Sequence, residues 1–222
     1  MPIRIDERLT AIATLIKCGT VADVGCDHGK LGYYLVSTDR AEKVIATDIS
    51  APSLQKAYEL AYDNGVSHLM ETRLGDGLLP IKSKEADVVV IAGMGGDVMA
   101  EILKTARLEG KQFDSFILSP NTHPEKVRLE LQQSNHTIVT DNLTECAGKY
   151  YTIISTKLNC DYKESLDANQ MIFGKFYLTD KVFLKRTIEE IAVMRNILET
   201  HRSEALEEKI ARLEAIIEKV KR

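Results

Sequence analysis

The fold is decided by the stretch Val21-Ala22-Asp23-Val24-Gly25-Cys26-Asp27-His28-Gly29. Its first half belongs to a short apolar run, Thr20 to Val24, which predicts a buried strand. Two glycines follow, and the segment from Leu31 to Val36 then has a composition that suits a helix. Strand, glycine turn and helix in this order predict an α/β sheet in which the turn faces a nucleotide-like ligand.

The turn contains acids where a phosphate-binding turn would contain none. Gly25 lets the backbone approach a ligand closely, because glycine has no Cβ and takes positive φ at little cost. A pyrophosphate site relies on a helix N-terminus facing an anion, and Asp23 and Asp27 would repel that anion. The acids favour S-adenosylmethionine, which carries a sulfonium and an ammonium group and no phosphate. The alternative is a glycine turn that only joins a strand to a helix.

A further acid lies where Rossmann-like folds place a ribose-binding carboxylate. The run Lys43 to Asp48 predicts another strand, and Asp48 lies 19 residues after Gly29. An ionised carboxylate there can accept hydrogen bonds from both ribose hydroxyls. Asp48 could instead cap the helix that Pro52 opens, but Ser50 is the better cap candidate.

A third acid follows another short strand pattern, in Leu74-Gly75-Asp76-Gly77. The Asp76 carboxylate is a candidate to receive the adenine amino group of the cofactor. The alternative is an ordinary Asp-Gly turn.

Composition agrees with a cytoplasmic enzyme. The chain has 222 residues with 44% hydrophobic content, enough for one sizeable core and an appendage. It has no apolar run long enough to cross a bilayer and no signal-peptide pattern at its start. Four cysteines lie far apart without a Cys-x-x-Cys pair, which favours reduced thiols over a disulfide or a metal site: Cys18, Cys26, Cys146 and Cys160. We expect Cys26 to be a small side chain beside the turn, not a nucleophile.

The charge of the chain does not mark it as a nucleic-acid-binding protein. Its 29 basic and 33 acidic residues give a net charge of −4. Binding to a polyanion would depend on a local stripe such as Lys175, Lys181, Lys185 and Arg186. Such stripes are more often solvated helix faces.

Strand and helix patterns alternate through residues 1–158, as a doubly wound sheet requires. Further strands are predicted at 86–92, 113–118, 137–139 and 150–156, and further helices at 98–108 and from Pro124 to about Gln133. In such sheets the ligand binds outside the carboxyl ends of the strands, and each of the motifs above lies at such an end. An amphipathic helix is predicted from Leu9 to Ile16, and Arg8 at its start is a candidate for the site or for a nucleic acid phosphate. The alternative for Arg8 is a solvated side chain.

Residues 159–222 have a different character. The stretch 159–169 is polar and predicts a linker. Later apolar residues follow two coiled-coil seams: Leu184, Ile188, Ile191 and Leu198, and then Leu206, Ile210, Leu213, Ile217 and Val220. A turn at Thr200 to Ser203, with Ser203 as N-cap, makes the two helices an antiparallel hairpin. The hairpin either mediates dimerisation or stabilisation, or it grasps a large substrate.

Four motifs together resemble one family. Asp23 to Gly29, Ile91-Ala92-Gly93-Met94-Gly95-Gly96, Leu118-Ser119-Pro120-Asn121 and Ile172-Phe173-Gly174 are similar to the bacterial tRNA (adenine(22)-N(1))-methyltransferases. The resemblance spans nearly the whole chain. It implies a Rossmann-like class I methyltransferase domain over 1–158 with its last strand antiparallel, a helical coiled-coil domain over 159–222, S-adenosylmethionine as cofactor and tRNA as substrate. The chain departs from many members of the family at Gly29-Lys30-Leu31-Gly32. This difference concerns the contacts expected with the methionine end of the cofactor.

The resemblance and the motifs define a set of candidate site residues. Catalytic candidates are Asp27 and His28, which would orient the base and the cofactor, although His28 could equally be structural. Cofactor-binding candidates are Asp23, Gly25, Cys26, Asp27, Gly29, Asp48, Ile49, Asp76, Gly77, Gly93 and Met94. Substrate-binding candidates are Arg8, Gly95, Gly96 and Asn121. We expect no metal and no membrane partner, and a monomer.

Three functions are compatible with these residues. The leading hypothesis is methyl transfer to N1 of adenine 22 of tRNA, which needs no base because N1 has a free lone pair, so that positioning supplies most of the rate. A methyltransferase for a small molecule or protein would keep the cofactor loop without needing the hairpin. A non-catalytic module would bind the cofactor and transfer nothing.

Overall fold

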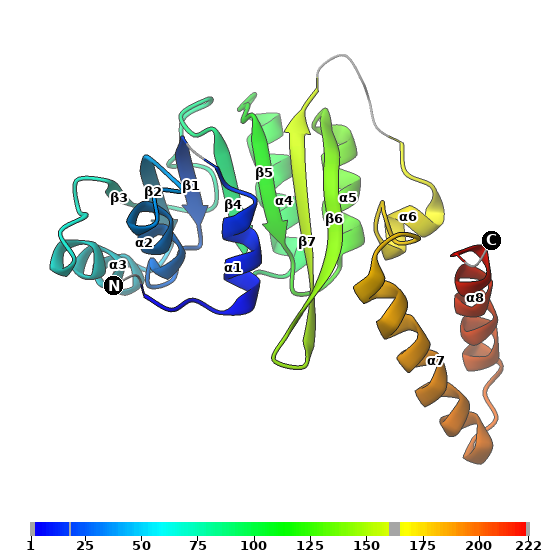
Figure 1. Ribbon diagram of the computed structural model, residues 1–222. Helices are drawn as coiled ribbons and strands as arrows, with labels where there is room; N and C mark the ends of the chain where they lie inside the picture. Colours follow the sequence, from blue (N-terminus) through cyan, green and yellow to red (C-terminus); the bar gives the residue numbers. More distant parts are fainter. Residues whose placement is uncertain (1–2, 18, 160–164, 221–222) are drawn as a thin grey trace.

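The computed structural model describes residues 3–17, 19–159 and 165–220 and is built on a seven-stranded sheet in the order β3-β2-β1-β4-β5-β7-β6 (Figure 1). The strands are β1 (Thr20–Val24), β2 (Lys43–Asp48), β3 (Met70–Leu74), β4 (Val88–Ala92), β5 (Ser115–Ser119), β6 (His136–Cys146) and β7 (Lys149–Leu158). Strands β1 to β5 pair in parallel, whereas β7 is antiparallel to both β5 and β6. The predicted Rossmann-like sheet with an antiparallel last strand is therefore confirmed.

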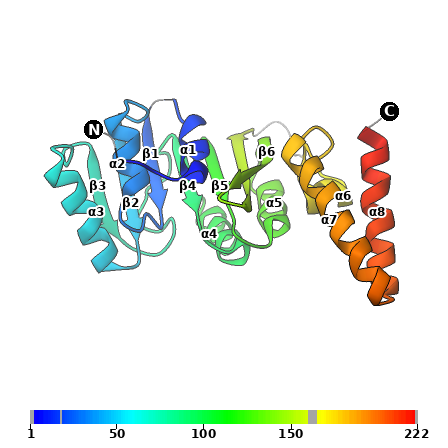
Figure 2. The same ribbon diagram turned by 60° about the horizontal axis from the view of Figure 1, so that its bottom comes forward.

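Helices cover both faces of the sheet (Figure 2). One face carries α1 (Glu7–Thr14), α2 (Lys30–Ser37) and α3 (Ala51–Asp63), and the other carries α4 (Gly96–Leu108) and α5 (Pro124–Gln133). Neighbouring residues of β1 serve the two layers, because successive side chains of a strand point to opposite faces. Val21 packs with the α1–α3 layer and Ala22 with the α4–α5 layer. Burial on both faces explains why β4 is a continuous apolar run and why β1 is apolar except for Thr20 and the buried Asp23.

The β6–β7 hairpin is longer than the sequence pattern predicts. We expected a strand at 137–139, whereas β6 continues to Cys146 with a register irregularity between Ile138 and Thr140. The extension contains Asp141, a buried acid that breaks the apolar alternation on which the prediction relied. Its burial is possible because an arginine from α5 neutralises it, a contact that no local pattern reveals.

Three helices follow the sheet: α6 (Ala168–Phe173), α7 (Lys181–Thr200) and α8 (Glu204–Val220). The predicted linker, 159–169, therefore overlaps the start of α6. Residues 160–164, which include Cys160, lie outside the described residues, and so does Cys18. Helix α6 begins at a capping box in which the Asp167 side chain accepts the backbone N–H of Gln170. Phe173, Tyr177 and Phe183 form an aromatic cluster where α6 meets α7.

Helices α7 and α8 form the predicted hairpin, and its buried face departs from the predicted seam only at Ile188 and Val220. Helix α7 buries Phe183, Thr187, Ile191 and Met194, whereas Ile188 is 56% exposed. Helix α8 buries Ile210, Leu213 and Ile216, and Val220 is 38% exposed. Most of the predicted seam is confirmed, because seven of its nine residues pack in the hairpin core: Leu184, Ile191, Leu198, Leu206, Ile210, Leu213 and Ile217. Helix α7 also contacts β6 and the aromatic cluster, which accounts for the burial of Phe183.

The hairpin extends past one particular edge of the sheet. In Figure 1 the parallel strands run downward, and the α7–α8 turn lies below the level at which they end. The hairpin tip and the carboxyl ends of β1 to β5 therefore lie toward the same end of the molecule. Within the described residues no helix is both long and apolar enough to span a membrane.

Candidate functional site

The carboxyl ends of four neighbouring strands surround a cleft of about 570 Å³, a volume in the range of small-molecule sites. Predicted site residues that line it are Arg8, Gly25, Asp27, Asp48, Ile49, Asp76, Gly77, Gly93 and Met94. The cleft is also lined by Val24, Gly75, Ala92, Val98 and Ile102. Residues as far apart in sequence as Arg8 and Ile102 thus meet in one place, because the parallel strands all end at the same edge of the sheet.

The glycine turn is held against the end of β2. The N–H groups of Gly25 and Cys26 both donate to the Thr47 carbonyl oxygen, at 2.8 and 3.0 Å. Gly25 has φ +70°, and the position of its missing Cβ is occupied by the end of the Met94 side chain. A side chain at residue 25 would therefore strain the backbone and displace the wall of the cleft.

Gly29 serves packing and not the cleft. It has φ +68°, and a Cβ there would lie 2.7 Å from the Cβ of Ala57. Helix α2 begins directly after Gly29, so the absence of a side chain lets α2 approach α3. Gly29 is not among the residues that line the cleft.

Asp48 organises the floor of the cleft. Its Oδ2 accepts the Asp27 backbone N–H at 3.1 Å, and its Oδ1 accepts the Ser50 N–H at 2.8 Å. Ser50 is the side-chain cap of α3, as predicted, because its Oγ accepts the Ser53 N–H. Each carboxylate oxygen has two lone-pair sites, so Asp48 retains acceptor capacity that points into the cleft from a fixed position.

Asp27 and His28 differ in their access to the cleft. Asp27 lines it, adopts φ +51° and has a side chain that is 75% exposed. His28 lies outside the lining residues, with its Nε2 3.3 Å from Asp27 Oδ1 and 3.3 Å from Lys56 Nζ. The structure thus gives His28 a position between two charged side chains behind the rim.

Asp23 and Cys26 lie beneath the glycine turn and do not line the cleft. Burial raises the pKa of Asp23 to about 7, against a backbone hydrogen bond from Gly32 that lowers it, and the nearby Asp48 carboxylate raises it further. Burial and the Asp23 and Asp48 carboxylates also raise the pKa of the Cys26 thiol. A buried thiol that resists ionisation is a poor nucleophile, in agreement with the structural role expected for Cys26.

Asn121, Gly95 and Gly96 shape the wall after β4 from behind. The Asn121 side-chain amide donates to the Gly93 carbonyl oxygen at 2.7 Å, and its backbone N–H donates to the Met94 carbonyl oxygen at 2.8 Å. Gly95 caps α4, and a Cβ on Gly96 would collide with the carbonyl oxygens of Thr122 and His123. None of the three lines the cleft.

Arg8 brings a cation to an otherwise acidic cleft. It is the single basic residue among the lining residues, which include three aspartates. Its guanidinium carbon lies 5.1 Å from the centre of the Tyr151 ring, a cation–π contact. A Cβ on Gly93 would lie 3.4 Å from the Arg8 guanidinium. Tyr151 was not among the predicted site residues. The strand pattern at 150–156 predicts the face of the sheet on which the Tyr151 side chain lies, but not that Arg8 packs against that side chain.

A second cluster was also missed, next to the wall after β4. The Asp97 carboxylate accepts from His123 Nδ1 at 2.5 Å and pairs with Lys126 Nζ. These partners, first Lys126 and then His123, lower the pKa of Asp97. The cluster joins the first turns of α4 and α5, and Val98 beside it lines the cleft. The sequence offered only separate surface charges at these positions.

The acidic cleft fits the cofactor that the sequence predicts. Carboxylates at the ends of β2 and β3 suit ribose hydroxyls and an adenine amino group, and the remaining acid suits a sulfonium or an ammonium group. The turn brings its backbone to the cleft without a side chain at Gly25. Among the described residues, no group of three or more His, Cys, Asp or Glu side chains is arranged to hold a metal ion.

Comparisons with known proteins agree with this geometry. Residues 5–154 match a family model described as a methyltransferase domain. The chain is 32% identical over 206 residues, 89% of its length and 85% of the relative's, to the tRNA (adenine(22)-N(1))-methyltransferase of Bacillus subtilis.

Two solved structures of relatives contain the cofactor or its product. A putative tRNA (m1A22) methyltransferase of Streptococcus pneumoniae in complex with S-adenosyl-L-methionine has a TM-score of 0.83 and 28% identity, covering 96% of this chain and 99% of that one. TrmK of M. capricolum in complex with S-adenosyl-homocysteine has a TM-score of 0.79 and 26% identity, covering 98% of each chain. The chain therefore belongs to the TrmK-like family of class I methyltransferases, which use S-adenosylmethionine as methyl donor.

Proposed function

We propose that this S-adenosylmethionine-dependent methyltransferase modifies N1 of adenine 22 of tRNA. The carrying observation is that the likeness to the B. subtilis tRNA (adenine(22)-N(1))-methyltransferase covers 89% of this chain, well beyond the 5–154 span of the methyltransferase domain. A cofactor-binding domain alone is common to methyltransferases of many substrates. Likeness that continues into the helical part is what favours a shared substrate.

The residues of the cleft take the following roles in this proposal. Asp48 accepts the ribose hydroxyls, Asp76 accepts the adenine amino group, and the backbone at Gly25 and Gly93 borders the methionine part of the cofactor. Ile49, Gly77 and Met94 supply contact surface. Bound S-adenosylmethionine supplies an electrophilic methyl group. Asp23, Cys26 and Gly29 support the turn from behind.

The acceptor side of the cleft faces a base that gains positive charge. When the N1 lone pair forms its bond to the methyl carbon, the sulfur–methyl bond breaks, so the sulfonium becomes a neutral thioether and the adenine becomes a cation. The Asp27 carboxylate, exposed at the rim of the cleft, stabilises that cation and holds the base. N1 lies on the Watson–Crick edge, so the base enters the cleft unpaired. His28 positions Asp27 through their 3.3 Å contact.

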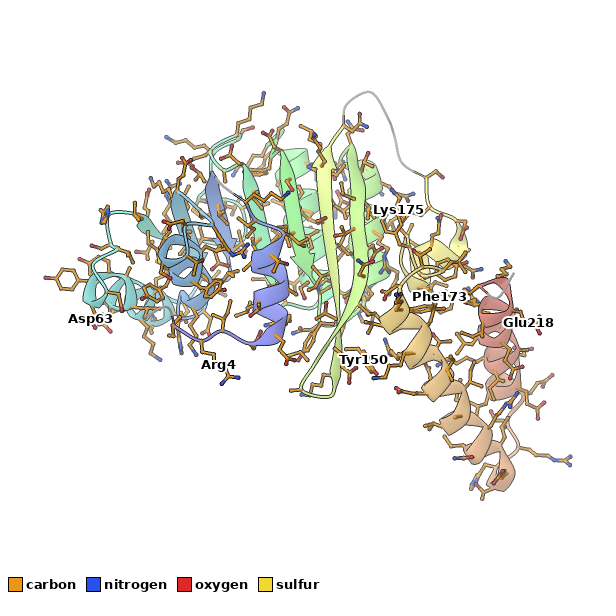
Figure 3. The ribbon with its side chains drawn as sticks, in the orientation of Figure 1. Arg4, Asp63, Tyr150, Phe173, Lys175 and Glu218 are labelled. Carbon is orange, nitrogen blue, oxygen red and sulfur yellow. The ribbon has the colours of Figure 1, made fainter. Side chains whose placement is uncertain are left out.

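A tRNA also needs contacts away from the cleft, because the chain as a whole is acidic. Helix α7 and the segment before it carry the basic stripe that the sequence singled out, with Lys175 before the helix and Lys181, Lys185 and Arg186 on it. Lys185 pairs with Glu145 at 3.0 Å. The Arg186 guanidinium lies 5.4 Å from the centre of the ring of Tyr150, a residue that is labelled in Figure 3. Lys175 donates to the Ile138 carbonyl oxygen and serves packing. We assign phosphate contacts to Lys181 and Arg186.

The test is methyl transfer from labelled S-adenosylmethionine to unmodified tRNA, followed by mapping of the modified nucleoside. We expect 1-methyladenosine at position 22 and no label on a matched tRNA in which adenine 22 is replaced by uridine. Label on the substituted tRNA, on the protein or on small molecules would overturn the proposal. Lys181→Ala/Arg186→Ala should raise the KM for tRNA and leave the KM for S-adenosylmethionine unchanged.

A further inference from the structure

A buried ion pair lies where the helical part of the chain meets the sheet. Arg128 on α5 and Asp141 on β6 form two hydrogen bonds, from Nε to Oδ2 at 2.7 Å and from Nη2 to Oδ1 at 2.9 Å. Their side chains are 2% and 1% exposed. Neither residue lines the cofactor cleft, so the methyl-transfer site does not account for them.

The pair also binds the backbone of residues 171–180, which we name the joint segment. Arg128 Nη1 donates to the carbonyl oxygens of Met171 and Ile172, at 2.9 and 3.3 Å. Asp141 Oδ2 accepts the Lys175 backbone N–H at 2.8 Å. The joint segment ends at Asp180, which caps α7 and accepts the Leu143 N–H of β6 at 2.6 Å. Polar contacts from α5 and β6 therefore clamp both ends of the segment that precedes the hairpin.

The backbone at Gly174 is shaped to fit this pair. Gly174 has φ +111°, and a Cβ there would lie 3.3 Å from the Asp141 carboxylate and 3.4 Å from Arg128 Nη2. The joint segment thus passes close over the ion pair, with glycine at the closest point. Figure 3 shows Phe173 and Lys175, on either side of Gly174, between the sheet and the hairpin.

Stability alone is a weak reason for such a pair. Apolar side chains of similar volume often hold two elements together as well as a buried ion pair does, because the pair must be desolvated. Unlike apolar packing, a buried ion pair fixes the orientation of the groups that it binds. The planar guanidinium has donors in fixed positions, and in Arg128 they reach a carboxylate and two carbonyl oxygens at once. Its distinctive contribution is therefore one defined orientation of the joint segment.

Helix α5 links this joint to the cleft. Asn121, just before α5, donates to the Gly93 carbonyl oxygen in the cleft wall, and Arg128 lies on the same helix after its first turn. The hairpin tip lies toward the edge of the sheet at which the parallel strands end (Figure 1), and the cleft is lined by residues at the ends of those strands. An orientation fixed at Arg128 is thus fixed relative to the reacting base.

We infer that the Arg128–Asp141 pair sets the direction of the α7–α8 hairpin so that one tRNA contacts the hairpin and the cleft together. Both residues are positioning residues, since they act through the joint segment. Without the pair the hairpin still folds, but its direction varies, and tRNA binding then includes the cost of ordering it. The tRNA half of the inference rests on the proposed function.

Two variants and one control test the inference. Arg128→Met/Asp141→Leu replaces the pair by apolar residues and leaves no unpaired charge. Arg128→Lys keeps a charge for Asp141 but loses the donors to the joint segment. The control is Glu130→Gln, which weakens the ion pair of Glu130 with Arg107, at 2.6 Å, on the same helix but toward α4.

The first measurement is the distance between nitroxide labels at Asp63→Cys on α3 and Glu208→Cys on α8, both exposed positions. Cys18, Cys146 and Cys160 are replaced by serine in the labelled chains. Pulsed electron paramagnetic resonance should give one narrow distribution in the parent and in the Glu130→Gln control, and broad distributions in both Arg128 variants. A narrow, unchanged distribution in the double variant would overturn the inference.

The second measurement is steady-state methylation. The double variant should raise the KM for tRNA about tenfold, with kcat and the KM for S-adenosylmethionine unchanged, whereas the control keeps all three values. Broader distance distributions in the double variant together with an unchanged KM for tRNA would overturn the part of the inference that concerns tRNA binding. If the parent chain methylates no tRNA, the proposed function fails, and the distances alone decide whether the pair directs the hairpin.

Discussion

Asp48 Oδ2 accepts the backbone N–H of Asp27 at 3.1 Å, which ties the end of β2 to the turn after β1. The same carboxylate binds the Ser50 N–H, so it reaches the cofactor site already oriented by two backbone groups. Because the Asp48 side chain is already ordered, accepting hydrogen bonds from a ligand would cost it little further conformational entropy. This relationship makes Asp48 the clearest single test of the site.

Asp48→Ala should weaken S-adenosylmethionine binding about tenfold or more, because a hydrogen bond to a charged group contributes about 1.5–3 kcal/mol. Isothermal titration calorimetry measures the change. Ser50→Ala is the matched control, since it removes the α3 cap while keeping the carboxylate. It should cost about 1 kcal/mol of unfolding free energy and leave cofactor affinity intact. Equal affinity in Asp48→Ala and the parent would remove Asp48 from the ribose site.

Arg8→Ala should lower kcat/KM for tRNA about tenfold, the loss expected for a charged contact of about 1.4 kcal/mol. The Tyr151 ring holds the guanidinium at the cleft, so Tyr151→Ala should show a smaller loss and Tyr151→Phe almost none. The measurement is tRNA methylation with saturating cofactor, alongside cofactor affinity by calorimetry. A drop in cofactor affinity at constant KM for tRNA would instead assign Arg8 to the cofactor.

Asp23 makes the free energy of unfolding depend on pH. Its pKa rises from 3.8 to about 7 on folding, chiefly through burial, so the folded state holds a proton more tightly than the unfolded state. Its contribution is fully present below about pH 4 and is lost as the pH rises toward 7. Asp23→Asn cannot ionise, so urea unfolding without cofactor should show the variant gaining stability over the parent between pH 4.5 and 7.5.

The size of that gain follows from the shift. One pKa unit corresponds to about 1.4 kcal/mol, so the difference between variant and parent should grow by at least that amount across the interval. A difference that stays constant with pH would show that Asp23 ionises freely in the folded chain.

Cys26 should react more slowly with iodoacetamide than Cys146 in the folded chain at pH 8. Burial and two nearby carboxylates raise the pKa of the Cys26 thiol, whereas Cys146 is partly exposed, and the thiolate is the reacting form. Mass spectrometry of tryptic peptides gives both rates. In urea the two thiols should react alike, which controls for peptide recovery, and faster alkylation of Cys26 in the folded chain would contradict the raised pKa.

Two isoleucines on α7 distinguish the observed packing from a strict heptad seam. Ile191→Ala should cost about 2–5 kcal/mol of unfolding free energy, since Ile191 is buried in the hairpin core. Ile188→Ala should cost less than about 1 kcal/mol, because Ile188 is 56% exposed. Urea denaturation of the two variants decides the matter, and equal losses would restore the heptad assignment.

The sequence alone predicted the sheet and most of the cleft, because both follow from local patterns. Apolar runs ending in glycine or aspartate mark strand ends, and parallel strands gather those ends at one edge. The spacing from Gly29 to Asp48 is likewise a property of one βα unit. Nine of the predicted residues therefore meet in the cleft. The other seven do not line it: Asp23, Cys26, His28, Gly29, Gly95, Gly96 and Asn121.

Only the tertiary structure decided how distant segments meet. Arg8 and Tyr151 are far apart in sequence and touch because α1 lies against the β6–β7 hairpin. Asp141 can be buried in a strand because Arg128 of α5 neutralises it, and α7 buries Phe183 beside the predicted seam because it packs against β6 and the aromatic cluster as well as α8. Such contacts depend on the pairing of elements whose local patterns do not encode one another. The residues of the candidate cofactor cleft thus follow from local sequence patterns, whereas the direction of the hairpin depends on long-range packing.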